Sequence, residues 1–333
     1  LDNRLLGSPW SIFTSDSMGT FHLAPTANGN CEVAIDSEVC AVSGSLPSDL
    51  RYDAAPDRSM TSDVERLNAF AYLTHELDAT TEIFAEALWY SAEAERIREQ
   101  NHNLTAQRFV VSKDAAFNPF GEDVKIRNVR PVDVGQRRIV VEDYSYRLLT
   151  GVRGMFNFWD WESAVLYSVA NTLDTDYNRI RADKFQAAIN QTDPSLAYNI
   201  FIGGNPDNVN NGVGRRNAQS VIDTFTVDVT RESETELALW DFKISSPEAF
   251  RLFDRDIGMA AGVEYRYESY KDIRDPLLSG AVPQVDGVTG APLSDSNVLG
   301  TSSTPSASGS RSVASAFAEF DVPLHSSLDM QLA

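Results

Sequence analysis

Residues 257–269 read IGMAAGVEYRYES, and apolar and polar side chains alternate along them. In an extended chain, alternate side chains point to opposite faces. One face would carry the apolar set Ile257, Met259, Ala261, Val263, Tyr265 and Tyr267. The other face would carry glycine, alanine and charged residues. This period of two predicts a β-strand with one face in hydrocarbon and the other against water or small groups.

The same alternation recurs in five further segments, at residues 67–77, 140–152, 159–169, 225–229 and 316–324. Most of these segments run to about ten to fifteen residues, whereas strands of soluble proteins cluster near five or six. Strands that cross a membrane need about nine to eleven residues. Residues 82–96 are also strand-like, but their phase stays open, because Phe84 and Tyr90 share a face with Glu82 and Glu86.

Short and long links alternate between these segments. The short links lie around Asp78, at 154–157, at 247–255 and at 325–326, and the long ones at 97–137, 174–222 and 271–310. Residues 280–312, which overlap the last of these links, are rich in Ser, Pro and Gly and are typical of a mobile loop. Outer-membrane barrels alternate short periplasmic turns with long external loops in this way.

We therefore expect an all-β fold, an antiparallel transmembrane β-barrel segment made of long amphipathic strands. The partial barrel would occupy residues 65–333 with about eight strands, and an external loop region would occupy residues 1–64. Such a protein contacts outer-membrane lipid.

The composition narrows the class of partner. The formal net charge is −20, which disfavours nucleic acid because phosphate binding needs a basic surface. The chain lacks an apolar run of about 18 residues, so the sequence predicts no membrane-spanning helix. Barrel strands are apolar on one face only and are compatible with the hydrophobic content of 42%.

The two cysteines, Cys31 and Cys40, lie close together in a polar stretch. A pair like this predicts a loop disulfide formed in an oxidising compartment. A metal pair is the alternative, but no further Cys or His lies nearby at ligand spacing.

Signals of enzyme chemistry are absent from the sequence. It contains no glycine-rich phosphate loop followed by lysine and no G-x-S-x-G elbow. The four histidines have no partner at metal-ligand spacing. We expect no catalytic residue, no metal site and no cofactor, and hence a protein that is not an enzyme.

Several stretches resemble the barrels of TonB-dependent outer-membrane receptors. The run WDFKIS at 240–245, followed by Gly262-Val263-Glu264-Tyr265-Arg266, resembles a strand pair of that family that turns at the periplasm and leads back to an external loop. Phe117-Asn118-Pro119-Phe120-Gly121 resembles an N-P-F-type motif of one of its external loops. The resemblance covers residues 66–333. The family's plug domain, TonB-contacting box and C-terminal aromatic strand are not found in this chain.

The resemblance implies energy-coupled uptake of a scarce nutrient across the outer membrane of a Gram-negative bacterium. The ligand would be a siderophore, cobalamin, an oligosaccharide or a similar molecule, and the TonB complex would act through the N-terminal region that this chain lacks. The loop closed by Cys31 and Cys40 is a further candidate for ligand contact. Residues expected to contact ligand are Phe117, Asn118, Pro119, Phe120, Asn205, Asp207, Asn208 and Asn210. Residues expected to face the lumen are Asp143, Arg147, Glu264, Arg266 and Glu268.

Two other functions stay open. A soluble, secreted glycan-binding β-sandwich would pack its apolar strand faces against each other. A passive porin would keep a polar channel.

Overall fold

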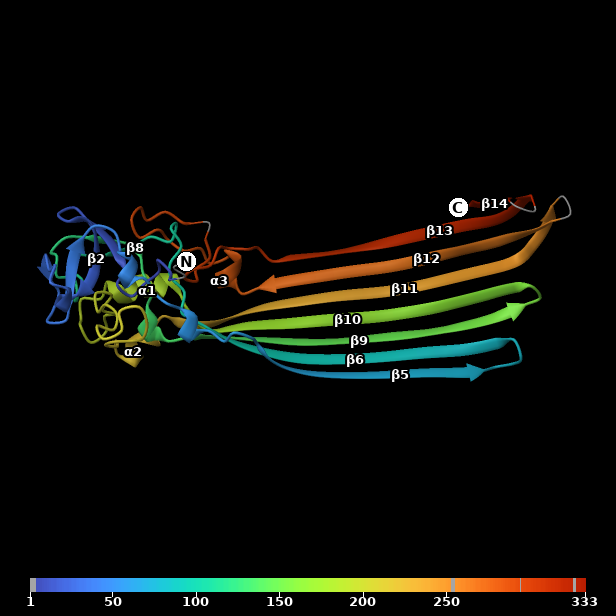
Figure 1. Cartoon of the computed structure of the whole chain (residues 1–333), viewed down its shortest axis with the longest axis horizontal. Coiled ribbons are helices and arrows are strands. Elements are labelled where there is room, and N and C mark those ends of the chain that lie inside the picture. The colour runs from blue at the N-terminus through green and yellow to red at the C-terminus, as the bar shows by residue number, and fades with distance from the viewer. Residues whose placement is uncertain (1–3, 253–254, 294, 326–327) are drawn as a thin grey trace.

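The computed structural model describes residues 4–252, 255–293 and 295–325 together with 328–333. A long sheet extends from a compact folded body, which we call the head (Figure 1). Strands hold 55% of the residues and helices 9%, and the pairings are antiparallel. The expected all-β class is therefore confirmed.

The long sheet is a meander in which each strand pairs with its neighbour in sequence. Within the described residues it contains eight strands. Within the described residues the sheet is open, because its outermost strands do not pair with each other. The strands are β5 (Asp63–Glu76), β6 (Thr81–Arg98), β9 (Arg137–Phe156), β10 (Trp159–Ile180), β11 (Thr226–Leu252), β12 (Arg255–Arg274), β13 (Ala307–His325) and β14 (Leu328–Leu332).

The chain reverses tightly at the end of the sheet that lies away from the head (Figure 1). Residues 77–80 join β5 to β6, and the Asp78 carboxylate accepts a hydrogen bond of 2.8 Å from the Thr80 amide. Residues 157–158 join β9 to β10, with Asn157 in the left-handed region at φ 53°. The link expected at 247–255 is mostly strand, and residues 253–254 within it lie outside the described residues, as do residue 326 of the link expected at 325–326 and residue 327. The alternation of short and long links is confirmed.

The head combines four separate segments, residues 4–62, 99–136, 181–225 and 275–306. Its sheet has six strands in the order β3-β4-β2-β1-β8-β7. The strands are β1 (Ile12–Ser15), β2 (Gly19–Pro25), β3 (Val33–Ala34), β4 (Val39–Ser43), β7 (Phe109–Val111) and β8 (Val124–Asn128). The helices are α1 (Ala182–Ile189), α2 (Gln219–Ile222) and α3 (Pro276–Ser279), with 3-10 turns at Thr26–Asn28, Ser48–Leu50, Ala55–Asp57 and Val132–Val134.

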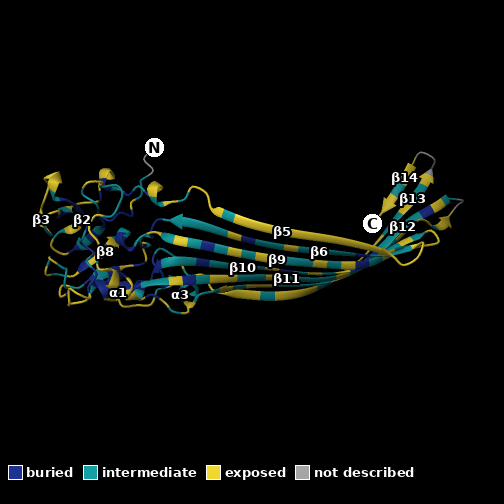
Figure 2. Cartoon of the chain, turned by 90° about the horizontal axis from the view of Figure 1, so that it is seen from below, coloured by how far each residue is buried: buried dark blue, intermediate teal, exposed yellow. Residues whose placement is uncertain are grey.

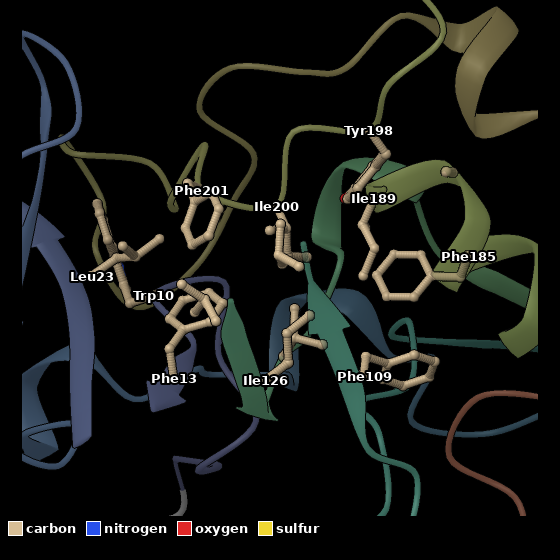
Figure 3. Close-up of a cluster of buried hydrophobic side chains, with 14 of the residues drawn as sticks. Trp10, Phe13, Leu23, Phe109, Ile126, Phe185, Ile189, Tyr198, Ile200 and Phe201 are labelled. Atoms are coloured by element: carbon tan, nitrogen blue, oxygen red, sulfur yellow. The ribbon is translucent and has the colours of Figure 1, made fainter. Parts of the chain in front are cut away.

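Apolar side chains from distant segments form the core of the head (Figure 3). Phe13 packs on Phe201 with ring centroids 5.1 Å apart, and Phe109 packs on Phe185 at 5.4 Å. Burial of each such ring stabilises the fold by about 1.5–3 kcal/mol. Buried residues gather in the head, whereas the long sheet is mostly half-buried or exposed (Figure 2).

This core corrects two expectations. Residues 1–64 do not form only loops, since four strands of the head's sheet come from them. Residues 280–312 do not form a mobile loop, because Val298 and Leu299 are fully buried and Ala307–His325 is strand. Apolar side chains in both regions belong to one head whose core also includes segments distant in sequence, as the contact between Phe13 and Phe201 shows.

Two glycines of the long sheet make room for aromatic rings. Gly151 lies directly opposite Phe84, and a Cβ at Gly151 would lie 2.5 Å from the Phe84 ring. Gly262 lies directly opposite Phe317, and a Cβ at Gly262 would lie 2.4 Å from the Phe317 ring. The rings therefore cover the bare backbone of the opposite strand.

Candidate functional site

The register of the long sheet sorts its side chains onto two faces, because directly opposite residues point the same way. One row across the sheet contains Leu73, Ala85, Thr150, Val165, Trp240 and Tyr265. We call the side that carries this row the apolar face. Its large side chains lie open, with Leu73 66% and Leu148 52% exposed. Within the described residues, no second layer covers them.

The opposite side, which we call the charged face, collects all the residues expected to face a lumen. Arg147 and Glu268 share a row through Ser168 and Leu237. An ion pair of 2.9 Å joins Arg266 to Glu268. Asp143, Arg147, Glu264, Arg266 and Glu268 thus lie on one face, and that this face lines a lumen stays a prediction.

The register also settles the phase of residues 82–96. Glu82 lies opposite Arg153, with an ion pair of 2.7 Å, and Phe84 lies opposite Gly151. Both therefore belong to the charged face, as do Glu86 and Tyr90. An ion pair of 3.0 Å joins Glu86 to Arg147.

One row of the charged face, near the tight turns, alternates in sign across four strands. Its residues are Glu82, Arg153, Glu162 and Lys243, each directly opposite the next. Glu162 and Lys243 lie 2.9 Å apart. Opposite charges placed in this way stabilise strand pairing by about 0.2–1 kcal/mol per pair.

Leucines interrupt the charged face in its middle. Leu149, Leu166 and Leu239 lie directly opposite one another on three adjacent strands. All three are half-buried in the long sheet. An apolar row of this kind lowers the free energy when another surface covers it and raises it against water.

The edge of the apolar band on the head side crosses the strands obliquely. On β9 the continuous apolar run ends at Tyr144, which lies opposite Asn171 of β10. On β10 it ends at Val169, which lies opposite Glu236 of β11. On β11 and β12, Ala238 and Tyr267 lie opposite each other. Tyr267 in turn lies opposite the polar residue Ser312 of β13, whose apolar run begins at Ala314.

From β9 to β13 this edge therefore shifts by two residues at three of the four strand junctions, in one direction. At the junction of β6 with β9 it shifts by two residues the opposite way, from Trp89, which lies opposite Tyr146, to Tyr144. The mean shift is about 5 Å along the strand for about 4.8 Å across it, an inclination of about 45°. Strands of membrane barrels are inclined by about 35–45°. At this inclination the stretch from Trp159 to Val169 spans a height of about 23 Å, against about 25 Å for the apolar band of such barrels.

The N-P-F-type motif lies in the head, between β7 and β8. The Asn118 amide donates hydrogen bonds of 2.9 Å to the carbonyls of Ser112 and Glu122. Phe120 packs against Phe21 at 5.0 Å and Phe201 at 5.6 Å. Of the four expected contact residues of this motif, Phe117 is half-buried and Pro119 is exposed.

The second loop expected to contact ligand, residues 203–211, binds the N-terminal segment through hydrogen bonds. The Asn210 amide donates a hydrogen bond of 2.8 Å to the carbonyl of Arg51, and the Trp10 indole donates one of 2.8 Å to that of Val209. Asn205 accepts a hydrogen bond of 3.0 Å from the Asp207 amide. Asp207 and Asn208 are exposed. The Phe120–Phe201 contact places the N-P-F-type motif beside the segment that leads into the second loop. Many polar side chains of both loops form hydrogen bonds within the head.

The expected disulfide between Cys31 and Cys40 is confirmed, with Cα atoms 5.4 Å apart. It closes the β3–β4 hairpin. An ion pair of 2.7 Å between Arg215 and Asp36 fastens this hairpin to the rest of the head.

A buried charge at the base of the head escaped the sequence reasoning. The Arg130 guanidinium donates a hydrogen bond of 2.8 Å to the carbonyl of Gly7 and lies 3.9 Å from Glu99. Burial lowers the pKa of Arg130 to about 10, so it stays cationic at neutral pH. Burial raises the pKa of Glu99, but the hydrogen bonds from Arg58 together with the positive charges of Arg58 and Arg130 keep that pKa below its ordinary value. No local motif marks these residues, because their partners are distant in sequence.

No protein-family model matches the chain, and a search of curated proteins gives no match. Two solved structures are similar to it, a closed and an open form of the ferric-catecholate import receptor Fiu from Escherichia coli K12. The closed form has a TM-score of 0.36 at 9% identity, over 98% of this chain and 37% of the receptor. The open form has a TM-score of 0.35 at 9% identity, over 98% and 40%. The chain thus spans about two fifths of the receptor's length.

No helix in the part of the chain that the structure describes is long and apolar enough to cross a membrane.

Proposed function

We propose that this chain is the barrel portion, with its folded external head, of a TonB-dependent receptor in the outer membrane of a Gram-negative bacterium. It would take up a scarce nutrient such as a siderophore, cobalamin or an oligosaccharide. The TonB complex would supply the energy through a plug domain outside these residues. The transport involves no bond-making step, so no catalytic residue or cofactor is assigned.

The oblique edge of the apolar band carries this proposal. A flat boundary between hydrocarbon and water cuts inclined strands at residues that shift steadily from one strand to the next. The overall shift of the edge from Tyr144 on β9 to Ala314 on β13 has the direction and mean size that this rule requires, although β11 and β12 end level with each other. In a soluble sandwich, a second sheet would cover the apolar residues. The openness of Leu73, Val165 and Tyr265 argues against that alternative.

The leucines of the charged face favour a receptor over a passive porin. A porin lumen is filled with water and is polar. The row of Leu149, Leu166 and Leu239 is instead suited to a covering surface, which a plug domain would supply. The charged rows on both sides of these leucines would hold that surface by polar contacts.

Ligand capture would then belong to the outer surface of the head. The exposed residues Pro119, Asp207 and Asn208 are the members of the expected set best placed for it. The side chains of Phe120, Asn205 and Asn210, which contact other residues of the head, would hold the exposed residues in position. The acidic balance of the chain disfavours a strongly anionic ligand.

Membrane fractionation of the full-length protein, followed by gel migration with and without boiling, tests the proposal. An outer-membrane protein that migrates faster unboiled supports a barrel. A protein recovered from the periplasm or the medium without detergent would refute it. Conductance in planar bilayers separates the two barrel types, since a plugged receptor should be nearly closed and a porin open.

A further inference from the structure

A pocket of about 610 Å³ lies where the head meets the end of β6. Most of its lining comes from residues 53–62 of the head and from Arg96 and Arg98 of β6. The Ser59 amide donates a hydrogen bond of 3.1 Å to the Ile97 carbonyl, and the Ile97 amide donates one of 3.1 Å to the Ser59 hydroxyl. These bonds hold the two walls together. We call this space the junction pocket, and its volume lies in the range of about 300–1,000 Å³ that ligand pockets have.

The two arginines of the pocket belong to the charged face of the long sheet. Alternate side chains of a strand point to the same face, and Arg96 and Arg98 continue the alternation of Glu82 and Glu86 along β6. Their Cα atoms lie about 7 Å apart, and both residues are half-buried. β6 reaches the head at this end (Figure 1). The junction pocket therefore opens on the side of the sheet that would face the lumen, at the level where the head begins.

The positive charge of these two arginines is not compensated within the part of the chain that the structure describes. Neither Arg96 nor Arg98 has a carboxylate oxygen within 4.0 Å, and Arg98 lies directly opposite Arg137 of β9. The ion-pair partner of Arg137 is Asp176, at 2.8 Å. Like charges placed directly opposite each other destabilise strand pairing. Because the chain has 48 acidic and only 28 basic residues, a group of unpaired arginines is unexpected, and a bound anion would relieve their repulsion.

The carboxylates near the pocket limit the charge of the anion that it can hold. Glu99 accepts a hydrogen bond of 2.6 Å from Arg58 Nε, so these two charges offset each other. Among the described lining residues, Asp53 carries the one carboxylate, which accepts a hydrogen bond of 3.0 Å from the Ala55 amide. Two unpaired guanidinium groups beside one carboxylate leave a small positive excess. A single carboxylate, which guanidinium groups bind in a bidentate manner, suits this excess better than a phosphate dianion, which Asp53 would repel.

We propose that the junction pocket binds a carboxylate group of the nutrient that the receptor takes up. Arg96 and Arg98 donate charge-assisted hydrogen bonds to the carboxylate oxygens. The pocket lies between the head, which would capture the nutrient, and the charged face, along which the nutrient would pass. A sugar acid and a small hydroxy acid both supply such a group. This assignment rests on the proposed function and adds a class of ligand to it.

Saturation-transfer NMR of the full-length protein in nanodiscs tests the assignment, because this method detects weak binding of small probes. The probes are glucuronate, glucose and lactate, with inorganic phosphate as a competitor. Glucuronate has a carboxylate where glucose has a hydroxymethyl group, so the pair isolates the effect of the charge. We expect glucuronate to bind about tenfold more tightly than glucose, the effect of one charge-assisted hydrogen bond. Tighter binding of glucuronate than of lactate would identify a sugar acid, and equal binding a hydroxy acid; both support the assignment.

Arg96→Gln and Arg98→Gln should each weaken the binding of glucuronate by about tenfold. Arg66→Gln is the matched control, because Arg66 lies on the charged face of β5, opposite Ala92 and outside the pocket. Arg98→Gln should also leave the urea midpoint of the ligand-free protein unchanged or raise it, since it removes the repulsion from Arg137. A lower midpoint would show that Arg98 stabilises the fold instead, which contradicts the assignment.

Three binding results would overturn the assignment. They are glucuronate binding no tighter than glucose binding, complete displacement of glucuronate by an equal concentration of phosphate, and the same loss of binding in Arg66→Gln as in Arg96→Gln. Any of them in a protein that fractionates with the outer membrane leaves the proposed function standing. A protein absent from the membrane refutes the proposed function itself.

Discussion

Ala260 and Ala261 offer a matched test of the two faces of the sheet. They are consecutive alanines of β12, and both are half-buried. Ala261 lies on the apolar face, opposite Ile244 and Ala318. Ala260 lies on the charged face, opposite Ser245 and Glu319. Substitution of each by arginine adds the same side chain to the same strand and differs only in the face that receives it.

The expected loss in the free energy of unfolding follows from the distance of Ala261 from the midplane of the membrane. Ala261 lies two residues from Val263, the middle of the apolar run of β12, and hence about 5 Å from the midplane. An arginine on the lipid face costs about 2–4 kcal/mol at the midplane and about 0–1 kcal/mol at the interface. We therefore expect Ala261→Arg to lower the free energy of unfolding by about 2–3 kcal/mol, which is about 30- to 150-fold in the equilibrium constant. Ala260→Arg should change it little, because Glu319 supplies an opposite charge worth about 0–1 kcal/mol.

Urea titration of the full-length protein in phospholipid vesicles, followed by tryptophan fluorescence, measures both variants. Heat-dependent gel migration checks that each variant still folds. In a water-exposed sheet the two substitutions would differ by no more than about 0.5 kcal/mol. Equal unfolding midpoints for the two variants would therefore refute the assignment of the apolar face to lipid.

Three further predictions concern the head. Cys31→Ser removes the short cross-link to Cys40 and should lower the free energy of unfolding of the head by about 2–3 kcal/mol on the chain-entropy account. Thermal unfolding with and without reductant measures this loss. A Cys31→Ser variant whose unfolding still responds to reductant would contradict the assignment of the stabilisation to this disulfide. Tyr198→Phe should cost about 1.5–3 kcal/mol, because it removes a hydrogen bond of 2.5 Å from a buried hydroxyl to the Asp133 carboxylate; Asp133→Asn in the same background should recover part of the loss in thermal melts. The pKa of Glu99 is lower in the folded state than its ordinary value of 4.5, so its contribution to stability is complete above that value and is lost as the pH falls through the lowered pKa. Urea midpoints of wild type and Glu99→Gln should therefore differ at neutral pH and converge in acid, and a constant difference would exclude this linkage.

Alternation in sequence predicted the faces of the sheet well. Side chains two residues apart on an extended chain point the same way whatever packs around them. The apolar set of β12, from Met259 to Tyr267, therefore lies on one face as expected. The same rule placed Asp143 and Arg147 with Glu264, Arg266 and Glu268 before any register was known.

Alternation alone did not decide the phase of β6. Phe84 and Glu82 share one face, and the sequence pattern does not show whether a face that carries both an aromatic ring and a carboxylate is the apolar or the charged one. The neighbouring strand decided it, since Arg153 pairs with Glu82 and Gly151 leaves room for the Phe84 ring. Both partners lie more than sixty residues away in the sequence.

The candidate ligand residues were harder to predict than the faces. Asn118 and Asn210 have the composition of exposed loop residues, yet their amides bind backbone carbonyls inside the head. Asn-rich loops have the same local signature whether they contact solvent, ligand or their own chain. Pro119, Asp207 and Asn208, which are exposed, were not distinguishable from their neighbours by sequence.

The sequence by itself determined the all-β class, the long amphipathic strands and the alternation of short and long links, because these depend on side-chain order along one extended segment. Only the tertiary structure decided that the long links and the N-terminal residues share one core, in which Trp10 meets Val209 and Arg130 meets Gly7. It alone also decided the oblique edge of the apolar band. The physical reason is that this edge depends on which residues of neighbouring strands lie opposite each other, a relation that hydrogen bonding between distant segments creates.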